Sequence, residues 1–120
     1  MLTRVNVERF SVTSSRSFRL MEFTRFDHGA VVHEGRTGET TGIVRLVVGN
    51  PLIMRQMVEH VRDAGSYAPV TILIDERPDG VRLSYDRMAS FLALYGSLEA
   101  LKVAHDLDAK VEALLTKAAG

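Results

Sequence analysis

A hairpin signal in the second half of the chain constrains the fold more than any other feature. Large β-branched residues occupy every second position of residues 70–75, which is the period of a strand with one buried side. Residues 77–80 read Arg-Pro-Asp-Gly, a turn in which proline presets one dihedral angle and glycine takes the left-handed one. Residues 81–85 then return as a partner strand, so the sequence predicts an antiparallel hairpin.

Three more extended segments and three helices are expected around this hairpin. The extended segments are residues 3–13, 18–27 and 43–48. The helical segments are about 51–63, 86–95 and 98–118. A bulge near residues 8–9 would give the first extended segment one inward face. This order predicts one α+β domain over residues 1–120, with an antiparallel or mixed sheet of about five strands and helices packed on one face.

Capping residues set the expected helix boundaries. Asn50 is a favoured N-cap residue, and Pro51 suits the first helical position, where a missing N–H costs nothing. Gly65 is expected to end that helix in the left-handed conformation. Asp86 and Ser97 are expected to cap the two later helices. The apolar stripe of the first helix is expected to contain Met54, Met57, Val58 and Val61.

Composition excludes several function classes. The chain has no cysteine, which excludes disulfides, thiolate metal sites and cysteine nucleophiles. Its 15 basic residues balance 15 acidic ones, so no net field attracts nucleic acid or an anionic membrane. The first residues lack the apolar run of a secretory signal, and no stretch approaches the roughly 18 apolar residues that span a bilayer. We expect a cytoplasmic protein without nucleic-acid or membrane partners and without a cofactor.

Asp27 and His28 form the most suggestive pair for chemistry. Histidine titrates near neutral pH and can serve as a general base or a metal ligand. Neighbours in a strand point to opposite faces, so the favoured interpretation is that both side chains satisfy local backbone groups at a strand end. The four histidines offer no i, i+4 pair on one helical face, so no metal site is expected.

Two further residues are candidates for ligand contacts together with His28. Asn50 is explained by helix capping, although the N–H groups of a helix start can also bind an anion. Tyr85 ends a strand beside the expected cap at Asp86, where core packing with a hydrogen-bonded hydroxyl is favoured. Residues 105–108 are interpreted as an exposed segment of an amphipathic helix, with Leu107 facing inward.

Five short strings carry a resemblance to a known family. They are Phe-Asp-His-Gly at 26–29, Gly-Asn-Pro-Leu-Ile at 49–53, Tyr-Ala-Pro-Val at 67–70, Asp-Gly-Val-Arg-Leu-Ser-Tyr-Asp at 79–86, and Leu-Asp at 107–108. In this order and spacing, over about residues 18–118, the chain resembles the domain of unknown function 302 family. The resemblance implies a compact α+β fold similar in outline to the TATA-binding protein, dimers, and no established activity.

The chain departs from that family in one place, and an assembly hypothesis follows. Members commonly carry a helix of several turns between the first two strands, whereas here residues 17–18 pass almost directly into residues 19–23. The sheet face that this helix would cover is then expected to be exposed, and such apolar patches favour association. The expected homodimer contacts are two or three of Phe18, Leu20, Met21 and Phe23.

The leading functional hypothesis is a non-catalytic, oligomerising module that binds a small molecule or a partner. The alternative is a small enzyme that uses His28 with Asp27, or an anion site at the helix start near Asn50. The two hypotheses differ in the pocket that they require. A catalytic site needs His28 beside a second titratable group in a concave pocket, whereas a binding module needs an apolar pocket without one.

Overall fold

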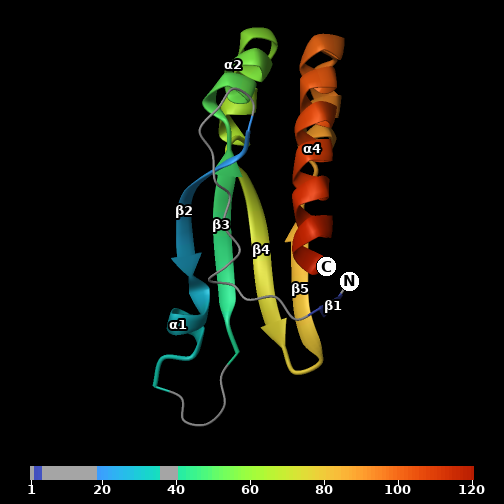
Figure 1. Cartoon of the computed structure of the whole chain (residues 1–120). Coiled ribbons are helices and arrows are strands. Elements are labelled where there is room, and N and C mark those ends of the chain that lie inside the picture. The colour runs from blue at the N-terminus through green and yellow to red at the C-terminus, as the bar shows by residue number, and fades with distance from the viewer. Residues whose placement is uncertain (1, 4–18, 36–40) are drawn as a thin grey trace.

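A twisted antiparallel sheet is the centre of the molecule (Figure 1). The computed structural model describes residues 2–3, 19–35 and 41–120. The strands are β1 (Leu2–Thr3), β2 (Met21–Asp27), β3 (Ile43–Gly49), β4 (Val70–Arg77) and β5 (Gly80–Tyr85), in the order β1-β5-β4-β3-β2. Every pairing among these strands is antiparallel. The α+β class and the antiparallel sheet are confirmed, with four full-length strands and a two-residue fifth.

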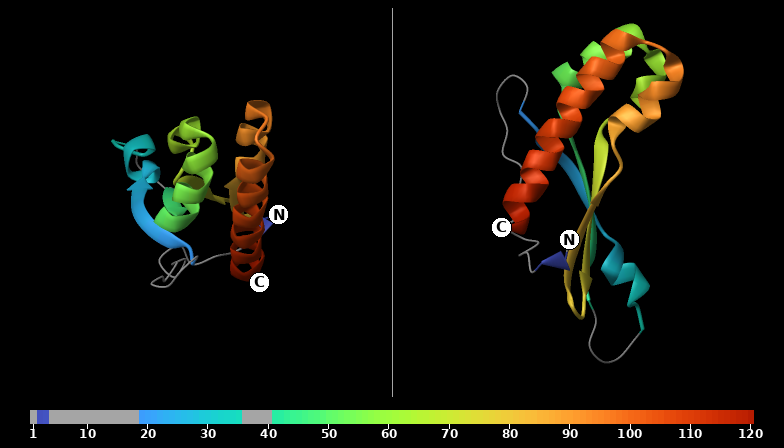
Figure 2. Two further views of the ribbon diagram at one scale, coloured as in Figure 1. Left: turned by 90° about the horizontal axis from the view of Figure 1, so that it is seen from above. Right: turned by 90° about the vertical axis from the view of Figure 1, so that its right-hand side faces the viewer.

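The helices gather mainly at one end and on one face of the sheet. They are α1 (His28–Val32), α2 (Pro51–His60), α3 (Met88–Leu92) and α4 (Leu98–Ala119), with 3₁₀ turns η2 (Arg62–Ser66) and η3 (Ala93–Tyr95). Figure 2 shows α4 crossing one face of the sheet beside α2, while α1 lies at the far end of β2. None of the helices in the described ranges has the length and apolarity that a bilayer span requires.

The core lies between the sheet and the pair α2 and α4. Val70, Ile72 and Ile74 alternate inward along β4, as the hairpin pattern predicted, and all three are buried. Gly80 closes the hairpin turn with φ +144°, which explains a glycine at that position. Leu46 of β3 is also fully buried in this layer. The predicted hairpin is therefore the part of the sheet on which the core is assembled.

The first long helix ends earlier than predicted. It stops at His60, and Val61 takes an extended conformation (φ −138°, ψ 103°) before the chain enters η2. This conformation suits a β-branched residue, and it redirects the chain so that Ala64 also becomes buried. Gly65 therefore lies inside η2 and is not among the glycines with positive φ.

The buried stripe of α2 also differs from the prediction. Ile53 and Met57 are buried, and Val61 beyond the helix end continues this line in steps of four residues. Met54 was expected in the core but is 36% exposed. Met57 and Val61 are buried as expected, and Val58 is partly buried against the core. The stripe differs from the prediction in that Ile53 takes the place of Met54.

The start of β2 changes the expected exposed patch. Leu20 is only 7% exposed and belongs to the core, so it is not part of an uncovered face. The strand begins at Met21 rather than at residue 18, and its pairing with β3 shifts between Glu22 and Thr24. This irregularity leaves Phe23 46% exposed. Phe18, residues 8–9 and the segment lacking the usual family helix lie outside the described residues.

Helix α1 was not predicted. It follows β2 directly, and the Asp27 side chain caps it by accepting a hydrogen bond from the Ala30 N–H at 3.0 Å. His33 ends this turn, with its Nε2 2.8 Å from the carbonyl oxygen of Thr41. An aspartate at a helix N-cap is a strong local signal, but a five-residue helix is too short to show an apolar period.

Candidate functional site

The candidate site is an apolar cavity at the start of α2. The cavity measures about 310 Å³ and lies where β2, the end of β3, α2 and the start of β4 meet. Its lining includes Phe23, Gly49, Asn50, Met54, Met57 and Pro69. Among the described residues, no titratable side chain contributes to the lining. We refer to it below as the apolar cavity.

Close packing at Gly49 shapes one wall of the apolar cavity. A Cβ atom at this position would lie 3.3 Å from Pro69 Cβ and 3.5 Å from Phe23 Cε2. Because glycine has no side chain, the space that a methyl group would fill remains open. The opposite wall comes from Met54 and Met57, whose flexible thioether side chains adapt to ligands of different shape.

Hydrogen bonds to both ends of its side-chain amide position Asn50 at the edge of this cavity. Its Oδ1 accepts from the N–H groups of Leu52 at 2.8 Å and Ile53 at 3.3 Å, which caps α2 as predicted. Its Nδ2 donates to the Arg19 carbonyl oxygen at 2.6 Å, which ties the start of β2 to the start of α2. Because Asn50 itself accepts from these N–H groups, the helix start offers little to an external anion.

His28 and Asp27 lie far from Asn50 along the sheet. Asp27 pairs with Val44 near the start of β3, whereas Asn50 follows the end of that strand. The His28 ring is exposed and stacks on Phe26, with 6.1 Å between the ring centres. Within residues 19–35 and 41–120, no cluster of three histidine or acidic side chains is suited to hold a metal ion. The structure therefore does not bring His28 and Asn50 into one site.

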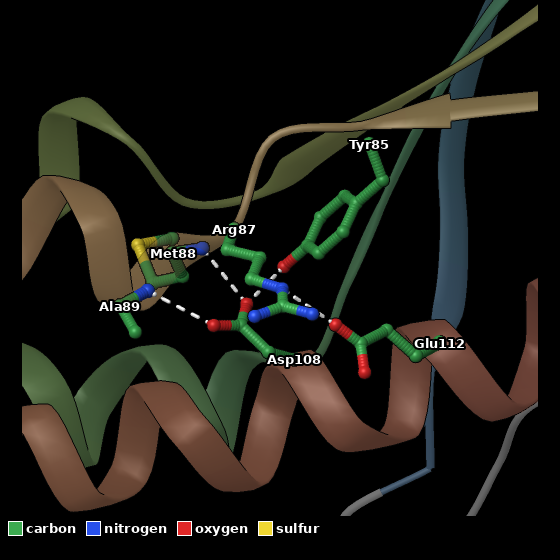
Figure 3. A network of polar contacts seen from close by, with 6 residues as sticks. All are labelled: Tyr85, Arg87, Met88, Ala89, Asp108 and Glu112. Atoms are coloured by element: carbon green, nitrogen blue, oxygen red, sulfur yellow. Dashed lines mark hydrogen bonds and ion pairs between the residues drawn. The ribbon is translucent and has the colours of Figure 1, made fainter.

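Tyr85 packs against the core and its hydroxyl is hydrogen-bonded, which confirms the favoured interpretation (Figure 3). Sequence reasoning missed the partner, Asp108, and the polar network around it. The Tyr85 hydroxyl donates to Asp108 Oδ1 at 2.5 Å, and the same carboxylate accepts from the N–H groups of Met88 at 2.8 Å and Ala89 at 3.0 Å. Asp108 is only 4% exposed. The interpretation of residues 105–108 is confirmed for exposed His105 and Asp106 and for inward Leu107, but it was wrong for Asp108.

The same network corrects the expected cap of α3. Asp86 was predicted to cap this helix, but the N-cap position is Arg87, which makes no side-chain capping bond. Asp108 on α4 supplies the carboxylate instead, because α4 packs across the N-terminus of α3 (Figure 3). A carboxylate at a helix N-terminus is favoured by both the unpaired N–H groups and the helix dipole. Arg87 forms an ion pair with Glu112 at 2.7 Å on the outer side.

Burial and the Asp108 carboxylate raise the pKa of Tyr85 far above its usual value. Desolvation disfavours the tyrosinate, and the hydrogen bond to Asp108 favours the neutral hydroxyl. The hydroxyl is therefore a permanent donor to Asp108 at neutral pH. Tyr85 was a candidate ligand contact, but its polar atom is engaged in joining the hairpin to α4.

Comparisons with known proteins agree with the resemblance drawn from the sequence. The family model described as Domain of unknown function DUF302 matches residues 13–118. The crystal structure of an uncharacterized conserved protein DUF302 from Bacillus stearothermophilus is similar, with a TM-score of 0.72 at 15% sequence identity. The similarity covers 82% of this chain and 77% of that one, and at such an identity it concerns the fold alone. No curated protein matches the chain.

Proposed function

The chain belongs to the family of the domain of unknown function DUF302, and we propose that it is a non-catalytic module that binds a small apolar molecule. The ligand would occupy the apolar cavity. The observation that supports this function is a ligand-sized volume of about 310 Å³ to which the described part of the chain contributes no titratable side chain. General acid–base chemistry needs a titratable group within hydrogen-bond reach of the substrate, so the cavity favours binding over catalysis.

The cavity also indicates the class of ligand. Asn50 is the polar side chain that residues 19–35 and 41–120 contribute to the lining, and its amide is already engaged with Arg19, Leu52 and Ile53. A charged ligand would lose its hydration without gaining a partner there. An uncharged molecule of one or two rings, or a short aliphatic chain, would instead replace water against methionine, proline and aromatic surfaces.

The experiment is a ¹H–¹⁵N NMR titration of the full chain with indole, which is uncharged and of suitable size. We expect shifts centred on the amides of Gly49, Leu52 and Met57. Gly49→Ala adds a methyl group beside Pro69 and Phe23 and should weaken binding several-fold. Gly65→Ala is the matched control, because nothing lies within 4 Å of its added Cβ. If these amides do not respond to millimolar indole, the proposed function is wrong.

The rival enzyme hypothesis has less support. Asp27 caps α1, and the His28 ring stacks on the Phe26 ring. Neither residue lines the apolar cavity. Native mass spectrometry of freshly purified protein would test the binding proposal further, because it detects a retained ligand and also reports the number of copies.

We also propose that copies of the chain associate along β2. This strand is the edge strand of the sheet formed by the described residues, and an edge strand can pair with that of a second copy. Phe23 and Phe26 remain 46% and 44% exposed on it, although Leu20 is buried and takes no part. A two-fold pairing along β2 would cover its backbone edge together with part of the exposed Phe26 ring.

A further inference from the structure

The sheet face opposite α2 and α4 carries a second group of polar and aromatic side chains. Arg45 of β3, Leu73 of β4 and Ser84 of β5 pair in register across three strands. Their inward neighbours Leu46 and Ile72 are buried on the helix side, so this row points to the opposite face. Figure 2 shows that the middle of this face carries none of the described helices.

Arg45 is held in a fixed position on this face. Its guanidinium carbon lies 5.5 Å from the centre of the Phe26 ring, and its Nε donates to Thr71 Oγ1 at 3.1 Å. The cation–π contact and this hydrogen bond together orient the planar guanidinium. No acidic side chain of the described residues forms an ion pair with it. The charge is therefore positioned by neutral groups rather than neutralised.

A hollow of about 420 Å³ adjoins Arg45 on this face. Thr71, Leu73 and Ser84 contribute to its lining from the sheet. Tyr67 and Phe91 also line it, and their rings stack with 4.8 Å between centres and an angle of 10° between planes. Tyr67 is fixed further by a 3.0 Å hydrogen bond between its hydroxyl and that of Tyr95. The lining also includes one acidic residue, Asp86.

We propose that this hollow is a second ligand site, which takes a small planar organic anion with a single carboxylate. The terminal nitrogens of a guanidinium match a carboxylate in a two-point fork. The hydroxyls of Thr71 and Ser84 are additional donors, and the Tyr67–Phe91 stack offers an aromatic surface for a flat ligand body. Asp86 disfavours a second negative charge on the ligand, which selects a monoanion over a dianion or a polyphosphate.

This site differs chemically from the apolar cavity. Pro69 and Val70 border both spaces, but only the hollow contains a cation, an anion and hydroxyl groups. The two proposals therefore have separate reporters. Indole should perturb the amides around Gly49, whereas an anionic ligand should perturb those of Leu73 and Ser84. Failure of one proposal leaves the other intact.

The test compares indole-3-acetate with indole-3-acetamide by ¹H–¹⁵N NMR titration of the full chain. The two probes have nearly the same shape and differ in charge. We expect indole-3-acetate to shift the amides of Leu73 and Ser84, and the acetamide to bind at least about tenfold more weakly. Equal affinity for the two probes, or shifts confined to the apolar cavity, would overturn the proposal.

Variants of Arg45 locate the carboxylate. Arg45→Gln should weaken indole-3-acetate binding by about tenfold or more. Arg45→Lys keeps the positive charge but not the two-point hydrogen bonding, so its affinity should lie between those of Arg45→Gln and the wild type. Arg82→Gln is the matched control. Arg82 lies on the same face, opposite Asp75 in the register of β4 and β5, and it does not line the hollow. An unchanged affinity in Arg45→Gln contradicts the proposal. If that variant does not fold, the lysine variant and the probe pair still decide the question.

Discussion

The hydroxyl of Tyr85 donates to the carboxylate of Asp108 across 23 residues of sequence, with 2.5 Å between the two oxygen atoms. This contact joins the end of the hairpin to the middle of α4. Since the same carboxylate also caps α3, three elements depend on one buried side chain.

Asp108→Asn should lower the free energy of unfolding by about 2–4 kcal/mol. The amide keeps one acceptor oxygen but places an NH₂ group against a helix N–H that needs an acceptor. Urea unfolding measures the change. Asp106→Asn is the control, because Asp106 is exposed on the same helix, and it should stay within about 0.5 kcal/mol of the wild type. A similarly small effect in Asp108→Asn would show that the network contributes little.

Tyr85→Phe should cost about 1 kcal/mol, which is less than the loss at Asp108. The variant removes one hydrogen bond but leaves the two backbone N–H groups bonded to the carboxylate. The double variant Tyr85→Phe/Asp108→Asn should lose less than the sum of the single losses, since both changes remove the same bond. Strict additivity in urea unfolding would contradict direct coupling between the two side chains.

Stability should fall as the pH rises above about 10, the usual pKa of tyrosine. Burial and Asp108 raise the pKa of Tyr85 in the folded state, so the folded protein retains this proton while the unfolded chain releases it. The unfolded state then binds fewer protons, and the free energy of unfolding decreases with pH. Unfolding from pH 8 to 11 should show a steeper decline in the wild type than in Tyr85→Phe. Parallel profiles would exclude this contribution.

Asn50→Ala should lower the free energy of unfolding by about 2 kcal/mol, at the upper end of N-cap effects. The loss is large because the Arg19 carbonyl oxygen also loses its donor. Asn50→Asp keeps the acceptor for Leu52 and Ile53 but lacks the donor to Arg19. Its free energy of unfolding, measured in urea, should therefore lie between those of the wild type and Asn50→Ala. If Asn50→Asp loses as much stability as Asn50→Ala, the cap itself contributes nothing.

Sedimentation at micromolar concentration should detect a dimer that depends on β2. Phe26→Ser removes an exposed ring from this edge strand and should shift the equilibrium toward the 13.3 kDa chain. Leu94→Ser is the control, because this 92% exposed residue lies in η3, away from β2. Observation of the monomer alone in the wild type would remove the assembly proposal.

His28→Ala should change stability by no more than about 1 kcal/mol. The ring is exposed and its stacking on Phe26 is the contact that the substitution removes. Thermal unfolding measures the effect, with exposed His60→Ala on α2 as the reference. A loss of several kcal/mol would mean that the ring supports the fold more than its exposure indicates.

Local signals in the sequence were sufficient for much of the fold. The hairpin at β4 and β5 followed from alternation and a Pro-Asp-Gly turn, and Asn50 and Ser97 cap α2 and α4 as expected. Each of these features is stabilised by groups within a few residues of one another. Such hydrogen bonds and periodicities depend only on residues that are close in sequence, and they were predictable for that reason.

The tertiary structure alone decided where the polar groups of distant segments meet. Asp108 reaches Met88 across 20 residues, and Arg45 reaches Thr71 across 26. A buried aspartate and an exposed one look alike in a helical sequence, and an arginine in an apolar strand does not indicate which ring lies beneath it. The sequence therefore determined the strands and the helix caps. The packing of α4 on α3 and of β3 between its neighbours determined the polar network and both candidate sites. The reason is that side chains far apart in the chain share an environment only after the elements have packed.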